Sequence, residues 1–280
     1  MNATNALATS INKRLSNLSK ERGVPHKNVV TDFLIERLLA RITSDKDLYN
    51  KVIFKGGYVC LREYASERYT MDLDAVLQKG DLNKTIESIK EVATKDLNDC
   101  SWFIFEEQID LETQGEYGGI RIIFRAGIGD ILKDIKRAQI IHFDLGIGDP
   151  ITPAPIKSSI KELLSKEELS WFVYPVETTI AEKLHALIVR RALNSRSKDI
   201  FDLWYLLPKC NPKILKEALD NTFKHRGDLV PISISHSLNT IDTTTLNRGW
   251  RSATVTIKTS ESFNDIYEKV IQYCRELIDT

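Results

Sequence analysis

Long apolar runs are absent from this sequence. No stretch approaches the about 18 consecutive apolar residues that a membrane-spanning helix needs. The N-terminal segment is polar and leads into Lys13 and Arg14, and no apolar core of the signal-peptide type follows. We therefore expect a protein with neither a membrane segment nor an export signal, and we expect it in the cytoplasm.

An excess of charge of one sign and closely spaced cysteines are also missing. The 39 Lys and Arg residues balance the 39 Asp and Glu residues. This balance excludes binding to a polyanion through bulk charge but allows a local basic patch. No CxxC pair occurs, which predicts thiols in a reducing compartment and argues against a zinc site. The four cysteines are far apart in the chain: Cys60, Cys100, Cys210 and Cys274.

What is present is an ordinary globular composition, with 42% hydrophobic and 28% charged residues among 280. Residues 1–45 carry apolar side chains at helical spacing, with a break at Gly23 to Pro25, and predict two helices. Residues 50–150 mix strand-like runs with helical patterns, and residues 155–280 are mostly helical. We therefore expect an α+β fold in which helices cover a mixed sheet.

The expected elements define two domains. A domain over residues 1–150 would hold the sheet and the N-terminal helices. A mainly helical domain over residues 151–280 would contribute to the cleft that holds the active site. The expected strands are 51–54, 71–77, 119–125 and 138–145, and the expected C-terminal helices are 156–167, 176–192, 199–207, 212–224 and 262–278.

The first candidate site is an acidic pair. Asp72 and Asp74 are two residues apart on an expected strand, so both side chains point to the same face. Two carboxylates held this close repel each other, and one tends to take up a proton unless a cation relieves the repulsion. Mg²⁺ (or Mn²⁺) suits such a pair, because it combines a few carboxylates with substrate phosphates. The alternative is a solvated strand face, which is the commoner explanation of an isolated D-x-D.

A glycine pair precedes the acids. Gly56 and Gly57 lie between an expected strand and an expected helix. Backbone N–H groups can approach a phosphate closely at such a turn, and the start of the helix favours an anion. The alternative is a tight turn that needs a positive φ. The spacing is not that of a Walker A loop. A phosphate-binding turn and a carboxylate pair together are nevertheless more specific than either alone.

A third acid, Asp144, ends another expected strand. If this strand lies beside the strand of Asp72 and Asp74, three carboxylates could hold two metal ions. One ion would activate the attacking oxygen, and the other would hold a triphosphate. An ordinary aspartate at a strand end is the alternative, and the spacing alone favours neither.

These motifs, taken in order, resemble a known family. A glycine pair, then D-x-D, then a later acid on a strand is similar to the nucleotidyltransferase fold of the polymerase-beta type. The fuller pattern resembles the AbiEii/AbiGii toxins over about residues 10–210. The matching segments follow one another along the chain: Glu36–Arg41, Phe54–Gly57, Arg68–Asp74, Phe143–Asp149, Glu182–Ala186 and Ser195–Leu203.

The resemblance implies roles for the first two motifs. Gly56 and Gly57 would contact nucleotide phosphates, and Asp72 and Asp74 would bind the metal. Tyr58 is a departure from the wider superfamily, because many nucleotidyltransferases have a serine here whose hydroxyl contacts phosphate. Backbone contacts must then carry more of the phosphate binding.

The third and fourth motifs correspond to Lys183 and to Asp199 or Asp202. A lysine on the flank of a packed helix can reach a triphosphate as a point charge, although a snorkelling surface lysine is the alternative. Asp199 and Asp202 share a helix face and either hold Lys183 in place or assist catalysis, and Asp199 could instead cap the helix. Arg68 is a further candidate for nucleotide binding. A run of five cations without an acid predicts either a solvated surface or a phosphate-binding one: Lys183, Arg190, Arg191, Arg196 and Lys198.

The resemblance implies an activity as well. It is the metal-dependent transfer of a nucleoside monophosphate from an NTP to an acceptor, tRNA or another RNA. The setting would be a toxin–antitoxin pair or phage defence by abortive infection, with a separate antitoxin protein as partner. Two alternatives stay open: an NTP-dependent phosphotransferase, and a non-catalytic module that binds a nucleotide or the antitoxin.

Overall fold

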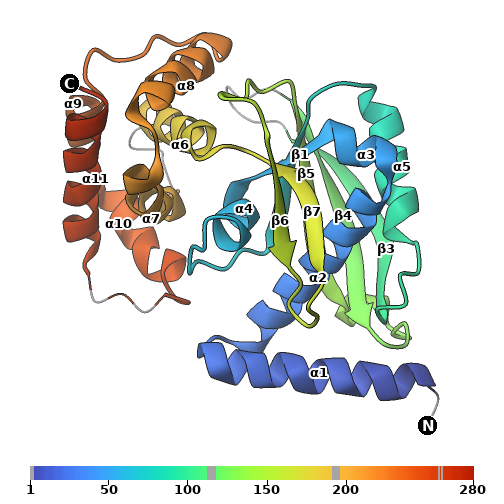
Figure 1. Ribbon diagram of the computed structural model, residues 1–280. Coiled ribbons are helices and arrows are strands. Elements are labelled where there is room, and N and C mark those ends of the chain that lie inside the picture. Colours follow the sequence, from blue (N-terminus) through green and yellow to red (C-terminus); the bar gives the residue numbers. More distant parts are fainter. Residues whose placement is uncertain (1–2, 112–117, 191–195, 258, 260) are drawn as a thin grey trace. The chain divides into compact units, whose positions relative to one another are not determined.

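The computed structural model of the chain describes residues 3–111, 118–190, 196–257, 259 and 261–280 (Figure 1). The chain forms two compact units. The sheet unit comprises Met1–Val59, Tyr69–Gly148 and Lys157–Val173, and the helical unit comprises Cys60–Arg68, Asp149–Ile156 and Tyr174–Thr280. Residues 60–68 therefore group with the C-terminal helices, and residues 157–173 group with the sheet.

The sheet unit contains the N-terminal helices and the strands described, except for Ile156 at the start of β6. Helix α4 (Gly56–Arg62) begins in this unit and continues into the helical unit. The other helices of the sheet unit are α1 (Ala3–Arg22), α2 (His26–Ser44), α3 (Lys46–Lys51) and α5 (Leu82–Ala93). The strands are β1 (Val52–Lys55), β2 (Asp72–Leu77), β3 (Ser101–Leu111), β4 (Gly119–Ile128), β5 (Gln139–Ile147), β6 (Ile156–Lys161) and β7 (Glu168–Val173).

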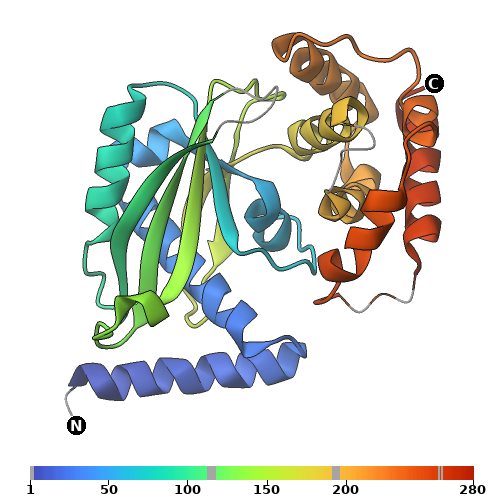
Figure 2. The same ribbon diagram turned by 180° about the vertical axis from the view of Figure 1, so that it is seen from behind.

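The strands form one 7-stranded mixed sheet in the order β3-β4-β5-β2-β1-β7-β6. Strand β2 runs parallel to β5 and antiparallel to β1, whereas β4 is antiparallel to both β3 and β5. Helix α2 lies across the strands in Figure 1, and Figure 2 shows the sheet from behind. The expectation of a mixed sheet with flanking helices is confirmed.

Strand β2 shows why the sheet has one apolar and one polar face. Leu73 and Ala75 are buried, whereas Asp72 and Asp74 are partly exposed. Successive side chains of a strand point to opposite faces, so the period-two pattern of the sequence separates the two sets. Helix α2 packs against β3, β5 and β7 and so covers the apolar face. The acidic side chains are left on the opposite face.

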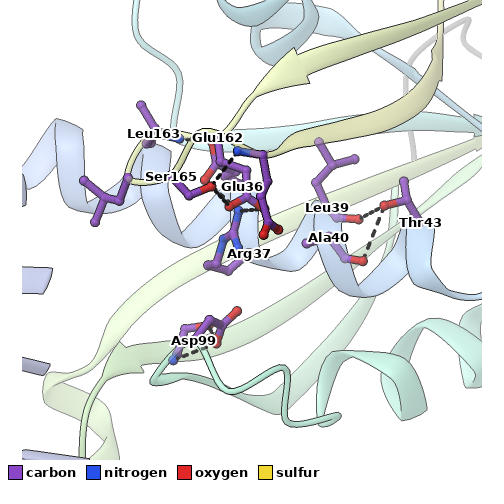
Figure 3. Close-up of polar contacts among 12 residues, drawn as sticks. Glu36, Arg37, Leu39, Ala40, Thr43, Asp99, Glu162, Leu163 and Ser165 are labelled. Atoms are coloured by element: carbon purple, nitrogen blue, oxygen red, sulfur yellow. Dashed lines mark hydrogen bonds and ion pairs between the residues drawn. The ribbon is translucent and has the colours of Figure 1, made fainter. Parts of the chain in front are cut away.

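Helix α2 is held to the sheet by buried charges as well as by apolar contacts (Figure 3). Arg37 Nη2 lies 2.8 Å from Glu36 Oε1 and 2.8 Å from Glu162 Oε1, which belongs to the turn between β6 and β7. Glu36 also accepts a hydrogen bond from the backbone N–H of Leu163. Arg41 contacts Asp99 at 2.8 Å. The charged residues of this segment of the family pattern therefore position α2.

One expected element is wrong. Residues 156–167 do not form a helix, because Ile156–Lys161 is strand β6 and Glu168–Val173 is strand β7. Strand β3 was likewise not expected, although it is the edge of the sheet beside β4. Each of these two edge strands lies beside the next strand along the chain, β6 beside β7 and β3 beside β4, and this tertiary pairing overrides a short local pattern.

The helical unit is built from six helices besides the end of α4 among the residues described. Helix α6 packs against α7 and α8, and α11 packs against α7 and α9. None of the helices described in either unit is long and apolar enough to cross a membrane. The six helices are α6 (Val176–Arg190), α7 (Ser197–Leu206), α8 (Pro212–His225), α9 (Ile234–Asn239), α10 (Thr244–Ala253) and α11 (Phe263–Leu277). The expected helix 262–278 is confirmed as α11, and the expected helix 176–192 is confirmed as α6 up to Arg190, with residues 191 and 192 outside the described residues.

Candidate active site

A row of four charged side chains crosses the middle of the sheet. Lys55 of β1 is the register partner of Asp74 of β2. Asp74 is the register partner of Asp144 of β5, which in turn pairs with Arg121 of β4. Register partners share a face and lie side by side, so the charges follow the order plus, minus, minus, plus. The condition on which a role for Asp144 depended, that its strand lies beside the strand of Asp74, is met.

Asp72 lies in the adjacent row and contacts a histidine. His142 of β5 is its register partner, and His142 Nδ1 is 2.8 Å from Asp72 Oδ1. The sequence analysis does not include His142 among its site candidates. The signal that it missed is the two-residue spacing of His142 and Asp144 on β5, which places both side chains on the same face as the acidic pair.

Asp144 is paired with an arginine that the sequence analysis did not single out. Arg121 Nε and Nη2 donate to the two carboxylate oxygens of Asp144, each at 2.7 Å. This hydrogen bond is the main reason that the pKa of Arg121 is raised, and the charges of Asp144, Asp72 and Asp74 raise it further. Arg121 is therefore a cation within the field of all three acids.

Gly56 has the backbone geometry that the acidic pair requires. Its φ is +75°, a conformation that residues with a side chain rarely adopt. A Cβ atom on Gly56 would lie only 2.1 Å from Asp74 Oδ2. The carboxylate of Asp74 therefore occupies the space that a side chain at Gly56 would fill. Gly57 follows within α4 and does not have a positive φ, so the conformational requirement rests on Gly56.

We predict that Gly56→Ala lowers activity about 100-fold, because its Cβ must displace the carboxylate of Asp74 by an ångström or more. Gly148→Ala is a matched control: its φ is +73°, but a Cβ there meets nothing within 4 Å. Both variants should lose about 1–2 kcal/mol of stability, because alanine is strained at a positive φ. Thermal unfolding measures this loss. Equal turnover by the two variants would show that the close approach of Gly56 to Asp74 has no role.

Lys183 lies in the helical unit and is enclosed by two acids. Its Nζ is 2.7 Å from Asp199 Oδ1 and 2.8 Å from Asp202 Oδ2. Only 9% of Lys183 is exposed. Lys183 is therefore not the snorkelling surface lysine that was the alternative. Burial lowers the pKa of Lys183, but the charges of Asp199 and Asp202 more than offset this, so the net shift is upward.

Arg68 completes this ion-pair network. Its Nε and Nη2 donate to the two oxygens of Asp202, each at 2.8 Å. Asp199 is 2.8 Å from the Nε of Arg196, whose side chain is 43% exposed. Burial raises the pKa of Asp202, but Lys183 and Arg68 hold it well below its ordinary value. Of the cationic run that begins at Lys183, Arg191 lies outside the described residues.

The acidic pair suits a hard divalent cation. Asp72 and Asp74 are partly exposed on one face and offer carboxylate oxygens, the ligands that Mg²⁺ and Mn²⁺ prefer. In the part of the chain that the structure describes, no group of three or more His, Cys, Asp or Glu is arranged to hold a metal ion. Both oxygens of Asp144 accept hydrogen bonds from Arg121. A metal at the pair would therefore need oxygen atoms of the substrate or of water.

A glycine turn against an acidic strand of a mixed sheet is the arrangement that the resemblance to nucleotidyltransferases implies, and comparison with known proteins shows that class. The profile of the family described as "Nucleotidyl transferase AbiEii toxin, Type IV TA system" matches residues 37–269. This match spans most of the chain. The chain therefore belongs to the AbiEii family of nucleotidyltransferase toxins.

Two solved structures have a similar fold. JHP933 from Helicobacter pylori is 14% identical with a TM-score of 0.51, and the match covers 90% of this chain and 92% of that one. MenT4, the nucleotidyltransferase toxin Rv2826c from Mycobacterium tuberculosis H37Rv, is 12% identical with a TM-score of 0.54, covering 94% of this chain and 99% of that one. At such identities the likeness concerns the fold alone. The search of curated proteins gave no match.

Proposed function

We propose that the protein is a metal-dependent toxin that transfers a nucleoside monophosphate from an NTP to an RNA acceptor such as tRNA. The observation that carries this proposal is the contact of Gly56 with Asp74, on the same sheet face as Asp72. This contact brings a glycine turn, whose backbone no side chain covers, next to two carboxylates. An NTP offers the matching groups, a chain of phosphates that takes hydrogen bonds and shares a divalent cation.

Asp72 and Asp74 would hold Mg²⁺ or Mn²⁺, which supplies positive charge to the phosphates. The contact of His142 with Asp72 orients that carboxylate. The backbone at Gly56 and Gly57 can approach a phosphate because no side chain intervenes. In the reaction, a bond forms between the acceptor oxygen and the α-phosphorus. The bond from the α-phosphorus to the bridging oxygen breaks, its electron pair leaves with pyrophosphate, and the proton of the acceptor hydroxyl passes to solvent.

For the helical unit we propose that Lys183 and Asp199 take the catalytic roles that the family resemblance implies. Asp202 is completely engaged by Lys183 and Arg68 inside the unit. Asp199 shares Lys183, and its other partner is Arg196. The side chain of Arg196 is 43% exposed against 6% for Arg68, so a substrate can displace it more easily. We therefore assign the active-site acid to Asp199. Asp202 and Arg68 then hold the lysine, and Arg68 does so instead of contacting the nucleotide.

The biological setting is also a proposal. Membership in a type IV toxin–antitoxin family supports a separate antitoxin protein as partner. MenT4, which shares the fold, is named a nucleotidyltransferase toxin. We propose that this chain acts as a nucleotidyltransferase toxin when its antitoxin is absent or no longer inhibits it, for example during phage infection.

The position of a radioactive label tests the reaction. Purified protein, Mg²⁺ and total RNA are incubated with each NTP labelled at the α- or the γ-phosphorus. We expect RNA to acquire the α-label from at least one NTP, with pyrophosphate as the second product. Transfer of the γ-label with release of NDP would show a phosphotransferase instead. Absence of transfer from all four NTPs, to RNA and to protein, would support a non-catalytic binding module.

A further inference from the structure

The charged row of Lys55, Asp74, Asp144 and Arg121 contains one cation whose donors are only partly used. Arg121 projects from β4 on the same face as the acidic pair, and 31% of its side chain is exposed. A guanidinium has five N–H donors in a planar fork. Two of its nitrogen atoms, Nε and Nη2, serve Asp144. Among the described residues, Nη1 of Arg121 makes no hydrogen bond.

The paired geometry restricts what Asp144 can do. A bidentate arginine–carboxylate pair is strong and holds both groups in one plane. Its two distances of 2.7 Å leave neither carboxylate oxygen without a donor. The guanidinium also places a positive charge beside Asp144, which opposes the approach of a divalent cation to that carboxylate. In this arrangement Asp144 holds an arginine better than it holds a metal.

We propose that Arg121 is a further substrate-binding residue of the transfer site, positioned by Asp144, and that its Nη1 donates to a phosphate oxygen of the bound triphosphate. This inference rests on the proposed function for the identity of the substrate. The chemistry fits because a guanidinium recognises phosphate through planar, charge-assisted hydrogen bonds. The arrangement places this donor one strand beyond Asp144, in the row that contains Asp74. Asp144 is then a positioning residue.

The test measures triphosphate binding and metal binding separately. It thereby distinguishes the proposal from two other roles: Asp144 as a metal ligand, and Arg121 as a mere counter-ion of the acids. Inorganic tripolyphosphate with Mg²⁺ is titrated by calorimetry, which needs neither the correct base nor an acceptor. Mn²⁺ alone is titrated by electron paramagnetic resonance. The variants are Arg121→Gln, Asp144→Asn and the double variant.

Arg125→Gln is the matched control for these variants. Arg125 lies four residues further along β4, on the same face, and forms a similar fork with Glu106 at 2.7 and 2.8 Å. Four residues of strand, about 13 Å, separate Arg125 from Arg121. Its replacement therefore removes an arginine that is paired with a carboxylate, but leaves the proposed site unchanged. We expect this variant to bind tripolyphosphate and Mn²⁺ as the wild type does.

We expect Arg121→Gln to weaken tripolyphosphate binding about 10- to 100-fold, the usual loss for one charged hydrogen bond. Asp144→Asn should weaken it less, and the double variant should be no worse than Arg121→Gln, because both changes act on one contact. Mn²⁺ affinity should not fall in any of the three. The KM for NTP should rise more than kcat falls, which a merely destabilised fold would not produce.

Three results would overturn the inference. Weaker Mn²⁺ binding by Asp144→Asn would make Asp144 a metal ligand. Unchanged tripolyphosphate affinity in Arg121→Gln would leave the arginine as a counter-ion of the acids. Failure of the wild type to bind tripolyphosphate would remove phosphate as the ligand of Nη1. The proposed function fails by a different result, the absence of α-label transfer from any NTP, and normal tripolyphosphate binding can accompany that failure.

Discussion

Asp74→Asn is expected to lower nucleotidyl transfer at least about 1,000-fold while the fold stays intact. Asparagine has nearly the same shape, and Asp74 is only partly buried, so packing changes little. The charge is the important difference, because one of the two carboxylates that would hold the metal is lost. Metal stabilisation of a developing phosphate charge is worth several kcal/mol, and about 4 kcal/mol corresponds to about 1,000-fold in rate.

The measurement is α-label transfer at saturating Mg²⁺, together with Mn²⁺ affinity. Asp110→Asn is a suitable control, because Asp110 is an exposed aspartate on β3 of the same sheet. The control should transfer label at the wild-type rate. If Asp74→Asn keeps more than about a tenth of the wild-type activity, the acidic pair is not the centre of the transfer site.

Lys183→Ala is expected to destabilise the protein by about 3–5 kcal/mol, independently of any effect on activity. Lys183 is the shared cation of Asp199 and Asp202, and all three side chains are buried. Removal of one partner of a buried ion pair leaves an uncompensated charge, and the cost is typically of this size. A snorkelling surface lysine would instead lose little stability on the same change.

Urea denaturation followed by circular dichroism measures this loss. Lys198→Ala removes an exposed lysine close by in sequence and should change stability by less than about 0.5 kcal/mol. In the Lys183→Ala background, Asp199→Asn should recover part of the loss because it removes one of the two buried carboxylates that have lost the lysine. A Lys183→Ala variant as stable as the wild type would show that Arg68 and Arg196 suffice for the two acids.

The ion pairs of Lys183 also predict how the difference in stability between the wild type and Lys183→Ala depends on pH. Lys183 and its neighbours lower the pKa of both Asp199 and Asp202 against the effect of burial. A carboxyl group with a lowered folded-state pKa contributes stability above its unfolded pKa of about 3.9, and this stability is lost as pH falls through the folded value. The free energy of unfolding of the wild type should therefore exceed that of Lys183→Ala most clearly above about pH 5. This difference should become smaller below about pH 3.

Local pattern was sufficient for several features of this protein. The two-residue spacing of Asp72 and Asp74 placed both acids on one strand face, because the period of a strand is a local property. The break at Gly23 to Pro25 separated the first two helices for a similar reason, since proline and glycine act on their own backbone. The family pattern also located the glycine turn and Lys183.

The partners of these residues were decided only by the tertiary structure. Asp144 binds Arg121, which lies 23 residues away in sequence, and the contact depends on the register of two antiparallel strands. Lys183 contacts Asp202 because α6 packs against α7, and residues 156–161 are a strand because they pair within the sheet. The sequence by itself determined which residue types share a face of one element. Which faces meet depends on long-range pairing and burial, and no local pattern encodes that free energy.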